Sequence, residues 1–381
     1  MFVKGKTYLD CYATIPQSPA NTGFSLKYMC NFNPHAPYST NEHDIVNKLR
    51  ALLVKLFKTQ DANIIINSGG SEGNSTIINY LKTKGKNIIC SSLDHPSVIN
   101  KIREIKSEGY DTKIINVKNG VLEWNDIKKL LDFKTNCIIL THVFSELGNK
   151  NDIGRLAGLI KQYFPHCHVH VDYVQGFLKD KMPDFSNVDS ASVSFHKVGA
   201  LKGAGCLWVK DPYKLKPLIS GSQNNSLRGG TIPVCNVASA YYALNEIQRL
   251  NMMPDYDLFS YLYNYLKKYF GDKVLIFTNP KKALGNCISF SLYNLCNKMI
   301  QLSLADKNIY IGTGSACSSK SLHNPLIESF NVPNGFHMPM RISWSKHTKR
   351  SHIEKFLNEL MPLTHSMQSN KNNNLKKYLD I

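Results

Sequence analysis

Asp172 and Lys197 are the residues whose type and position first indicate chemistry. Asp172 ends the apolar run HVHVD, where a buried carboxylate is costly unless it faces a cation or a proton donor. Lys197 ends the small, polar string SFHK, and a lysine inside a cleft can lose enough proton affinity to form a Schiff base. Pyridoxal 5'-phosphate (PLP) offers both a ring nitrogen for a carboxylate and a carbonyl for a lysine. Each residue also has an ordinary interpretation, since Asp172 could cap a helix and most lysines lie on the surface.

Two further segments could complete such a site. The string SGGSEGN at 68–74 is a glycine-rich turn between a predicted strand and helix, and its backbone N–H groups could bind a phosphate through Gly70 and Ser71. His95 opens a helix after a strand, so it could stack on the cofactor ring and move protons near neutral pH. Taken alone, a glycine-rich turn of this kind is about as often a purely structural turn as an anion-binding site, and His95 could be an ordinary histidine at a helix start.

Cys317 and Arg341 are candidates for handling a substrate. Cys317 lies in the Gly- and Ser-rich string GTGSACSSKS, which predicts an exposed loop suited to a reactive thiol. A thiolate on such a loop could reach a bound substrate and then carry sulfur to an acceptor. Arg341, in the strand-like run MRISW, could bind a substrate carboxylate with both of its terminal nitrogens, although arginines in strands are commonly sheet-edge residues.

The elements that would position these residues alternate between strand and helix from about residue 40 to 210. Such alternation is typical of a mostly parallel sheet covered by helices. Seven strands are predicted, at residues 63–67, 87–91, 113–117, 137–142, 168–172, 191–195 and 205–209. Ligands bind beyond the carboxyl ends of the strands in sheets of this kind, which is where the residues above stand. The sequence therefore predicts an α/β fold with a large, seven-stranded sheet domain, helices on both of its faces, and a smaller α+β domain.

Helical periodicity sets the predicted domain boundaries. The run NEHDIVNKLRALLVKLF has one apolar face and a capping candidate in Ser39 or Thr40. A long helix at 235–250 leaves the sheet, and Asn251, Pro254 and Asp255 mark a boundary. We expect a large PLP-binding domain at 15–253, a small domain from 1–14 and 254–365 that carries Cys317, and a polar tail at 366–381.

The chain is strongly basic. Its 381 residues include 46 Lys and Arg against 28 Asp and Glu, a formal charge of +18 that would attract polyanions and anionic substrates. No long basic block appears, which favours a Lys- and Asn-rich coding bias over a nucleic-acid site. Direct contact with nucleic acid stays open at this point.

Cysteines and apolar runs indicate the compartment. The ten cysteines form no CxxC pair, which favours reduced thiols in a cytoplasmic setting. The N-terminal MFVKGKTYLD has no apolar signal core, and no run is long enough to cross a bilayer, so we expect no membrane association. His166, His168, His170 and Asp172 share one strand face but span too far for one ion, so no metal is expected.

With these residues in chain order, the sequence resembles a cysteine desulfurase of the NifS/IscS type, in the class V aminotransferase group of fold-type I PLP enzymes. The likeness runs from YLDCYATIP at 8–16 to MRISWS at 340–345. Individual strings are modest, whereas the ordered set, including SFHK and GSAC, is highly specific. The resemblance implies a homodimer that takes sulfur from L-cysteine, leaves L-alanine, and forms a persulfide on Cys317.

The resemblance also implies a role for each matching residue. Asp172 would pair with the pyridine nitrogen, Gln175 would bond the ring hydroxyl, and His95 would stack on the ring. Lys197 would hold the cofactor and move protons, and Cys317 would attack the substrate sulfur. The phosphate would be held by Gly70, Ser71, Ser194, His196 and Thr231 of the partner subunit, and the substrate carboxylate by Asn33 and Arg341.

The short GSAC loop resembles the branch of the family that passes sulfur to other proteins. The acceptor would be a scaffold for iron-sulfur cluster assembly, with transient cluster contact at Cys317, or a tRNA-thiolation enzyme. The sequence departs from the family pattern at two places. Phe144 and Ser145 replace two asparagines near the ring hydroxyl, where Ser145 could substitute, and residues 224–226 (NNS) replace a Glu-Arg-Gly string near the dimer seam.

Two other classes of function compete with this interpretation. One is another PLP aminotransferase or lyase in which Cys317 is incidental. The other is a divergent nucleic-acid-binding protein whose basic surface carries the function and whose cofactor is vestigial or absent.

Overall fold

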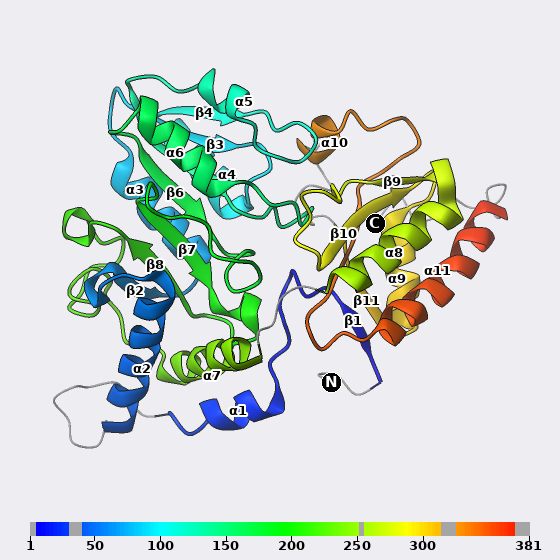
Figure 1. Cartoon of the computed structure of the whole chain (residues 1–381), viewed down its shortest axis with the longest axis horizontal. Coiled ribbons are helices and arrows are strands. Elements are labelled where there is room, and N and C mark those ends of the chain that lie inside the picture. The colour runs from blue at the N-terminus through cyan, green and yellow to red at the C-terminus, as the bar shows by residue number, and fades with distance from the viewer. Residues whose placement is uncertain (1–4, 30–39, 251–254, 314–324, 370–381) are drawn as a thin grey trace.

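The computed structural model describes residues 5–29, 40–250, 255–313 and 325–369. Figure 1 shows two bodies, each built on its own sheet, with the N-terminal segment running between them. The larger sheet has the seven predicted strands, in the order β2-β8-β7-β6-β5-β3-β4. Neighbouring strands are parallel except at β8, which runs antiparallel to both β2 and β7. The predicted α/β fold with a mostly parallel seven-stranded sheet is confirmed.

Three strands begin and end where the sequence predicts them: β3 (Asn87–Ser91), β6 (His168–Asp172) and β8 (Gly205–Val209). The bounds of the other four strands differ from the prediction by one or two residues: β2 (Ile64–Asn67), β4 (Asp111–Ile115), β5 (Thr135–Thr141) and β7 (Ser190–Ser194). The largest shift is at β4, an edge strand whose register is set by its pairing with β3 from Asp111 onward. Because its first residues are exposed and polar, hydrophobicity alone places this strand too late.

Helices cover both faces of the large sheet. On one face lie α3 (Gly70–Leu81) and α4 (Pro96–Ser107), and on the other α2 (Thr40–Phe57), α6 (Ile153–Tyr163) and α7 (Val234–Leu250). Strand residues alternate between the two cores: Ile138 joins the α2 side, whereas Cys137 and Ile139 join the α3 side. Strands buried on both faces read as continuous apolar runs, which is why the sequence signal is strong.

The smaller sheet has five strands, in the order β1-β11-β12-β10-β9. They are β1 (Thr7–Leu9), β9 (Val274–Ile276), β10 (Cys287–Leu292), β11 (Ile309–Thr313) and β12 (Met340–Ser343). The helices that pack on this sheet are α8 (Tyr256–Phe270), α9 (Asn297–Asp306) and α11 (Arg350–Ser369). Since β1 pairs with β11, the chain passes from the small sheet directly to the mouth of the large one at residues 10–16.

Shorter elements connect these layers. They include α1 (Pro19–Ser25), α5 (Trp124–Lys128), α10 (Pro325–Ser329) and several 3-10 turns, of which η3 (Phe195–Val198) carries Lys197. The domain boundaries predicted above stay a prediction. Within the described residues, no helix combines the length and apolarity needed to cross a membrane.

A candidate cofactor site at the strand ends of the large sheet

A cleft of about 640 Å³ lies where β5, β6 and β7 end and where α3 and α4 begin. Fourteen residues line it, and nine of these are predicted site residues: Gly70, Ser71, His95, Ser145, Asp172, Gln175, Ser194, His196 and Lys197. Residues separated by more than 100 positions in the chain thus meet in one cavity. The parallel strands explain this, because their carboxyl ends lie along one edge of the sheet.

The start of α3 is built to approach β7 closely. The backbone N–H of Gly70 donates to the Ser194 hydroxyl at 2.7 Å. A Cβ on Gly70 would lie 2.4 Å from Val174 Cγ2, and Gly69 has a φ of +139°, so both positions require glycine. Small serines on β7 and glycines on α3 therefore leave a polar hollow at a helix N-terminus, the kind of place that binds a phosphate.

Asp172 is held in the cleft by a buried chain of polar groups. It lies on the α3 side of β6, opposite the apolar Val169 and Val171. Asn74 Nδ2 donates to Asp172 Oδ2 at 3.0 Å, and the backbone N–H of Val174 donates to Oδ1 at 3.1 Å. Both carboxylate oxygens are therefore fixed, and each keeps a free lone pair for a donor in the cleft.

The chain continues behind Asn74. Its Nδ2 also donates to the Ser97 hydroxyl at 3.0 Å, so its Oδ1 must accept from His170 Nε2, 3.0 Å away. His170 then carries its proton on Nε2, and its Nδ1 accepts from the Ser190 hydroxyl at 2.8 Å. Burial lowers the pKa of His170 to about 3, so the ring stays neutral.

An Asn74→Leu variant should therefore bind PLP more weakly. Leucine fills a similar volume but leaves Asp172 Oδ2 and His170 Nε2 without their buried partner, which costs about 1–3 kcal/mol and lowers PLP affinity by roughly ten- to a hundredfold. Titration of the apoprotein with PLP measures the change. Asn47→Leu, on the exposed side of α2, is the matched control. Equal PLP affinities for Asn74→Leu and wild type would show that Asn74 does not support Asp172.

His95 sits at the N-cap of α4. Its Nδ1 accepts from the backbone N–H of Ser97 at 3.1 Å, which leaves Nε2 as the protonated ring nitrogen. The ring lies at the cleft mouth, partly open to solvent, and loss of water inside the cleft lowers its pKa below the usual histidine value. A neutral ring over the cleft is suited to stacking on a flat cofactor.

Lys197 projects from η3 into the cleft. Its Nζ donates to the backbone carbonyls of Tyr12 at 2.6 Å and Ala13 at 2.9 Å. Burial and, to a smaller extent, the nearby Arg341 lower the pKa of Lys197, Asp10 and Asp172 act in the opposite direction, and the net pKa is about 8. The Tyr12 and Ala13 carbonyls come from the segment that joins the two sheets, which fixes the amine at the junction.

The pH dependence of PLP capture follows from this shift. An amine attacks a carbonyl only when it is neutral, and the neutral form predominates above its pKa. We expect the rate at which the apoprotein gains a visible absorption band to rise with pH, with a midpoint near 8. The measurement is stopped-flow mixing with PLP across the neutral to basic range. A midpoint close to the ordinary lysine value of 10.5 would contradict this environment for Lys197.

His196 and Gln175 also point toward residues 12–14. His196 Nδ1 lies 2.9 Å from the Thr14 hydroxyl, and burial lowers the pKa of His196 to about 4, so it is neutral. Gln175 Nε2 donates to the Tyr12 carbonyl at 2.9 Å. Residues 12–14 therefore form hydrogen bonds with three residues that line the cleft: Gln175, His196 and Lys197.

Two predicted residues lie outside the cleft lining. Thr231 is exposed and does not line the cleft of its own chain. Arg341, on β12, donates through Nη2 to Asp10 at 2.7 Å and through Nη1 to the Ser145 carbonyl at 3.0 Å, so it stands next to the cleft through Ser145. Its Nε is buried and has no partner among the described residues. Cys317 and Asn33 lie outside the described residues.

Sequence reasoning missed several residues that shape the site. Asn74, Ser97, Thr141, Val143 and Val174 line the cleft. Asn74 had a signal, because it lies four positions after Gly70 on the helix that opens at the glycine turn, and residues so spaced share a helix face. Tyr12 had none, since it acts through its backbone carbonyl.

The two departures from the family pattern have structural explanations. Phe144 is buried in the α2-side core, and Ser145 lines the cleft. Asn224 pairs with both backbone groups of Ile66, at 3.0 and 3.2 Å, and so covers the free edge of β2. Residues 224–226 all have positive φ, of 48°, 56° and 61°, a conformation that asparagine tolerates better than most residues. The effects of both departures on activity stay predictions.

The histidines of β6 are engaged in hydrogen bonds. His168 Nε2 lies 2.7 Å from the Ser190 hydroxyl, which also contacts His170. Among the described residues, no cluster of three or more His, Cys, Asp or Glu could hold a metal ion.

The cleft fits PLP at three separate points. The glycine hollow at α3 suits a phosphate, the fixed carboxylate of Asp172 suits a pyridinium nitrogen, and the Lys197 amine suits an aldehyde. Fold and site together define a PLP enzyme of fold-type I.

Comparison with known proteins agrees with this geometry. The family described as aminotransferase class-V matches residues 8–356. A cysteine desulfurase IscS from Dictyoglomus turgidum is 29% identical, over 87% of this chain and 87% of its own length. A relative named NifS/IcsS protein homolog, from Lactobacillus delbrueckii subsp. bulgaricus, is 31% identical, over 73% of this chain and 74% of its own length. A solved NifS-like protein superposes with a TM-score of 0.85 at 22% identity and covers 95% of this chain and 100% of its own.

The chain therefore belongs to the class V aminotransferase family, and within it to the NifS/IscS-like group. Members of this family depend on PLP. The predicted family and cofactor are thereby confirmed.

Proposed function

We propose that this protein is a cysteine desulfurase, which takes sulfur from L-cysteine, releases L-alanine and forms a persulfide on Cys317. The observation that carries the proposal is that the Lys197 amine, with its pKa lowered to about 8, shares one cleft with the fixed carboxylate of Asp172 and the glycine hollow of α3. Curated relatives that span most of the chain bear the name cysteine desulfurase.

We propose that Gly70, Ser71, Ser194 and His196 hold the phosphate. Asp172 binds the ring nitrogen, and Gln175 with Ser145 faces the ring hydroxyl. His95 covers one face of the ring. When bound, PLP supplies an electron sink that weakens the bonds at the α-carbon of an amino acid.

Lys197 holds the cofactor through its amine and is the nearest base for proton transfer at the substrate. Its two carbonyl partners, at Tyr12 and Ala13, can keep the free amine beside the reacting carbon. Because the pKa of Lys197 is about 8, a substantial fraction of the amine is neutral near physiological pH.

We propose that Arg341 and Asn33 bind the substrate carboxylate. Arg341 Nε has no partner among the described residues, and Nη2 is bound to Asp10, so one donor direction stays available. The Cys317 thiolate then bonds to the substrate sulfur as that sulfur leaves the β-carbon, and the β-carbon gains a proton to give alanine.

We also propose a homodimer in which the partner subunit's Thr231 completes the phosphate site, which accords with the exposure of Thr231 in its own chain. The sulfur acceptor would be an iron-sulfur scaffold, with transient cluster contact at Cys317, or a tRNA-thiolation enzyme. The cysteines within the described residues are free thiols, which supports work in the reducing cytoplasm. We also propose that the chain divides into a large domain at 15–253, a small domain formed by 1–14 and 254–365, and a C-terminal tail at 366–381.

The proposed reaction is tested by incubating the PLP-loaded protein with L-cysteine and a thiol reductant and measuring sulfide and alanine together. We expect the two products in equal amounts. Sulfide accompanied by pyruvate in place of alanine would instead identify a lyase.

A further inference from the structure

Lys179 is a buried lysine directly behind the candidate site. Its side chain is only 7% exposed. Its Nζ donates to Gln175 Oε1 at 2.9 Å and lies 5.1 Å from the centre of the Tyr12 ring. Among the described residues, no carboxylate lies within 4.0 Å of this amine. A buried amine whose one close partner is a neutral amide needs an explanation beyond stability, because burial without a counter-ion is unfavourable.

The contacts of Gln175 give that explanation. A side-chain amide has an accepting oxygen at one end and a donating nitrogen at the other. Gln175 lies between the Lys179 amine, which donates, and the Tyr12 carbonyl, which can only accept. One orientation satisfies both partners, with Oε1 toward Lys179 and Nε2 toward Tyr12. The nitrogen carries two hydrogens, and since Gln175 also lines the cleft, the second is available there.

We propose that Lys179 is a positioning residue that locks the Gln175 amide with its N–H toward the cleft, where it meets an anionic oxygen of the bound cofactor. This inference rests on the proposed function, because it requires the cleft to hold PLP. Lys179 would then act on the cofactor only through Gln175, a role that neither Lys197 nor Asp172 performs.

The backbone conformation of the residue before Lys179 also supports a functional role for this lysine. Leu178 has a φ of 54°, a left-handed conformation that is unfavourable for a residue with a Cβ. This conformation delivers the Lys179 side chain into the interior. Strain of this kind persists only where the surrounding structure enforces it, and it is often found at functional sites.

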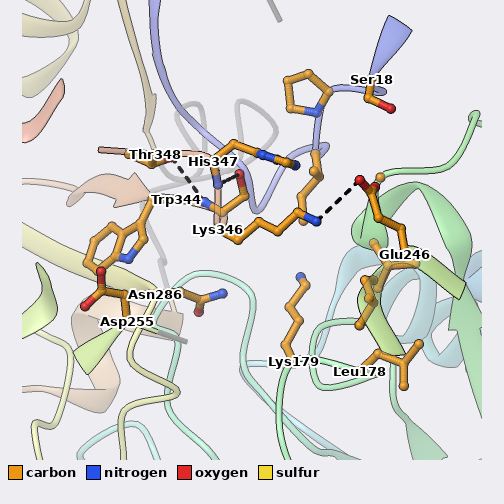
Figure 2. A pocket seen from close by; sticks show the side chains of 16 residues that line it. Ser18, Leu178, Lys179, Glu246, Asp255, Asn286, Trp344, Lys346, His347 and Thr348 are labelled. Carbon is orange, nitrogen blue, oxygen red and sulfur yellow. Dashed lines mark hydrogen bonds and ion pairs between the residues drawn. The ribbon is translucent and has the colours of Figure 1, made fainter. Parts of the chain in front are cut away.

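The far side of Lys179 lines a separate cavity between the two bodies, together with residues such as Val198 and Trp344. Figure 2 shows the Lys179 amine in this cavity and Glu246 turned toward Lys346, with which it pairs at 3.6 Å. Glu246 is therefore engaged elsewhere. The other carboxylate that lines this cavity, Asp255, caps the start of α8.

Two cationic side chains, those of Lys197 and Arg341, lie near enough to Lys179 to affect its pKa. Burial, and then Lys197, lower its pKa to about 7, while Cys11 and Cys287 act in the opposite direction and Arg341 adds to the lowering. The hydrogen bond to Gln175 Oε1 survives loss of one proton, since a neutral amine still donates.

The test compares Lys179→Met with wild type, both loaded with PLP, by titrating the visible absorption band with pH. The titrating group is the nitrogen through which Lys197 holds the cofactor. Without Lys179 the Gln175 amide is held only by the Tyr12 carbonyl and is less firmly oriented. The anionic oxygen of the cofactor then receives a weaker hydrogen bond from Gln175, which raises the proton affinity of the titrating nitrogen. We expect the midpoint to rise by about one pH unit. Lys181→Met, an exposed lysine two residues away, should leave the midpoint unchanged.

Two further variants separate positioning from a structural or purely electrostatic role. Gln175→Met should raise the midpoint similarly, and the double variant Gln175→Met, Lys179→Met should add little to it. Lys179→Arg keeps the donor and should stay near the wild-type midpoint. If Lys179→Met folds poorly, Lys179→Gln is titrated in its place.

An unchanged midpoint in Lys179→Met, or fully additive shifts in the double variant, would overturn the role of Lys179 while leaving the proposed function intact. A wild-type protein that shows no visible band with PLP would instead overturn the proposed function itself.

Discussion

A Lys197→Ala variant is expected to lose the visible absorption band that PLP gives the wild-type protein and to release alanine from cysteine at least about 10³-fold more slowly. The amine that holds the cofactor and the base that moves protons are the same group, so one substitution removes both contributions. The Tyr12 and Ala13 carbonyls then have no amine to accept from. Absorption spectra and an alanine assay on the purified variant measure the two losses.

The control for Lys197→Ala is Lys202→Ala, an exposed lysine five residues further along the chain. It should retain both the band and the activity, because it lies outside the cleft lining. A Lys197→Ala protein that keeps the band on a covalently bound cofactor would mean that another lysine holds PLP.

A Cys317→Ser variant is expected to keep the visible band but to release alanine and sulfide from cysteine only at the background rate. A hydroxyl is a far weaker nucleophile toward sulfur than a thiolate and cannot carry a persulfide. Cofactor binding should be unaffected, because the proposed PLP contacts come from other residues. This separation of cofactor binding from turnover distinguishes the variant from Lys197→Ala.

The matched control is Cys296→Ser, since Cys296 is also a free thiol and is exposed. It should behave as the wild type. Undiminished alanine release by Cys317→Ser would rule out sulfur transfer to this thiol and support the competing interpretation, another PLP aminotransferase or lyase in which Cys317 is incidental.

The large sheet could be predicted from the sequence because its strands are buried on both faces. The apolar centre of NIICS and the alternating valines of HVHVD both indicate strands, and β3 and β6 match the prediction in full. The edge strand β4 is exposed along much of its length, so its bounds shifted. The short strand β1 was not predicted at all, because its pairing with β11, some 300 residues away, defines it.

The residues of the candidate site likewise fall into those that local sequence patterns reveal and those that they do not. Residues that end strands, such as Asp172, or open helices, such as Gly70 and His95, stand at positions that local patterns reveal. Asn74 and Lys179 do not. Their importance depends on which side chain each one meets across the fold, Asp172 for Asn74 and Gln175 for Lys179. Spacing in one sequence cannot show such contacts.

The central claim is that PLP occupies the cleft at the ends of β5, β6 and β7 and is held there by one lysine. Reduction of the loaded protein with borohydride makes the bond to the cofactor permanent, and peptide mapping by mass spectrometry then identifies the modified residue. We predict a single pyridoxyl group on Lys197. A pyridoxyl group on Lys179, or on any lysine outside the cleft, would contradict the site assigned to this protein.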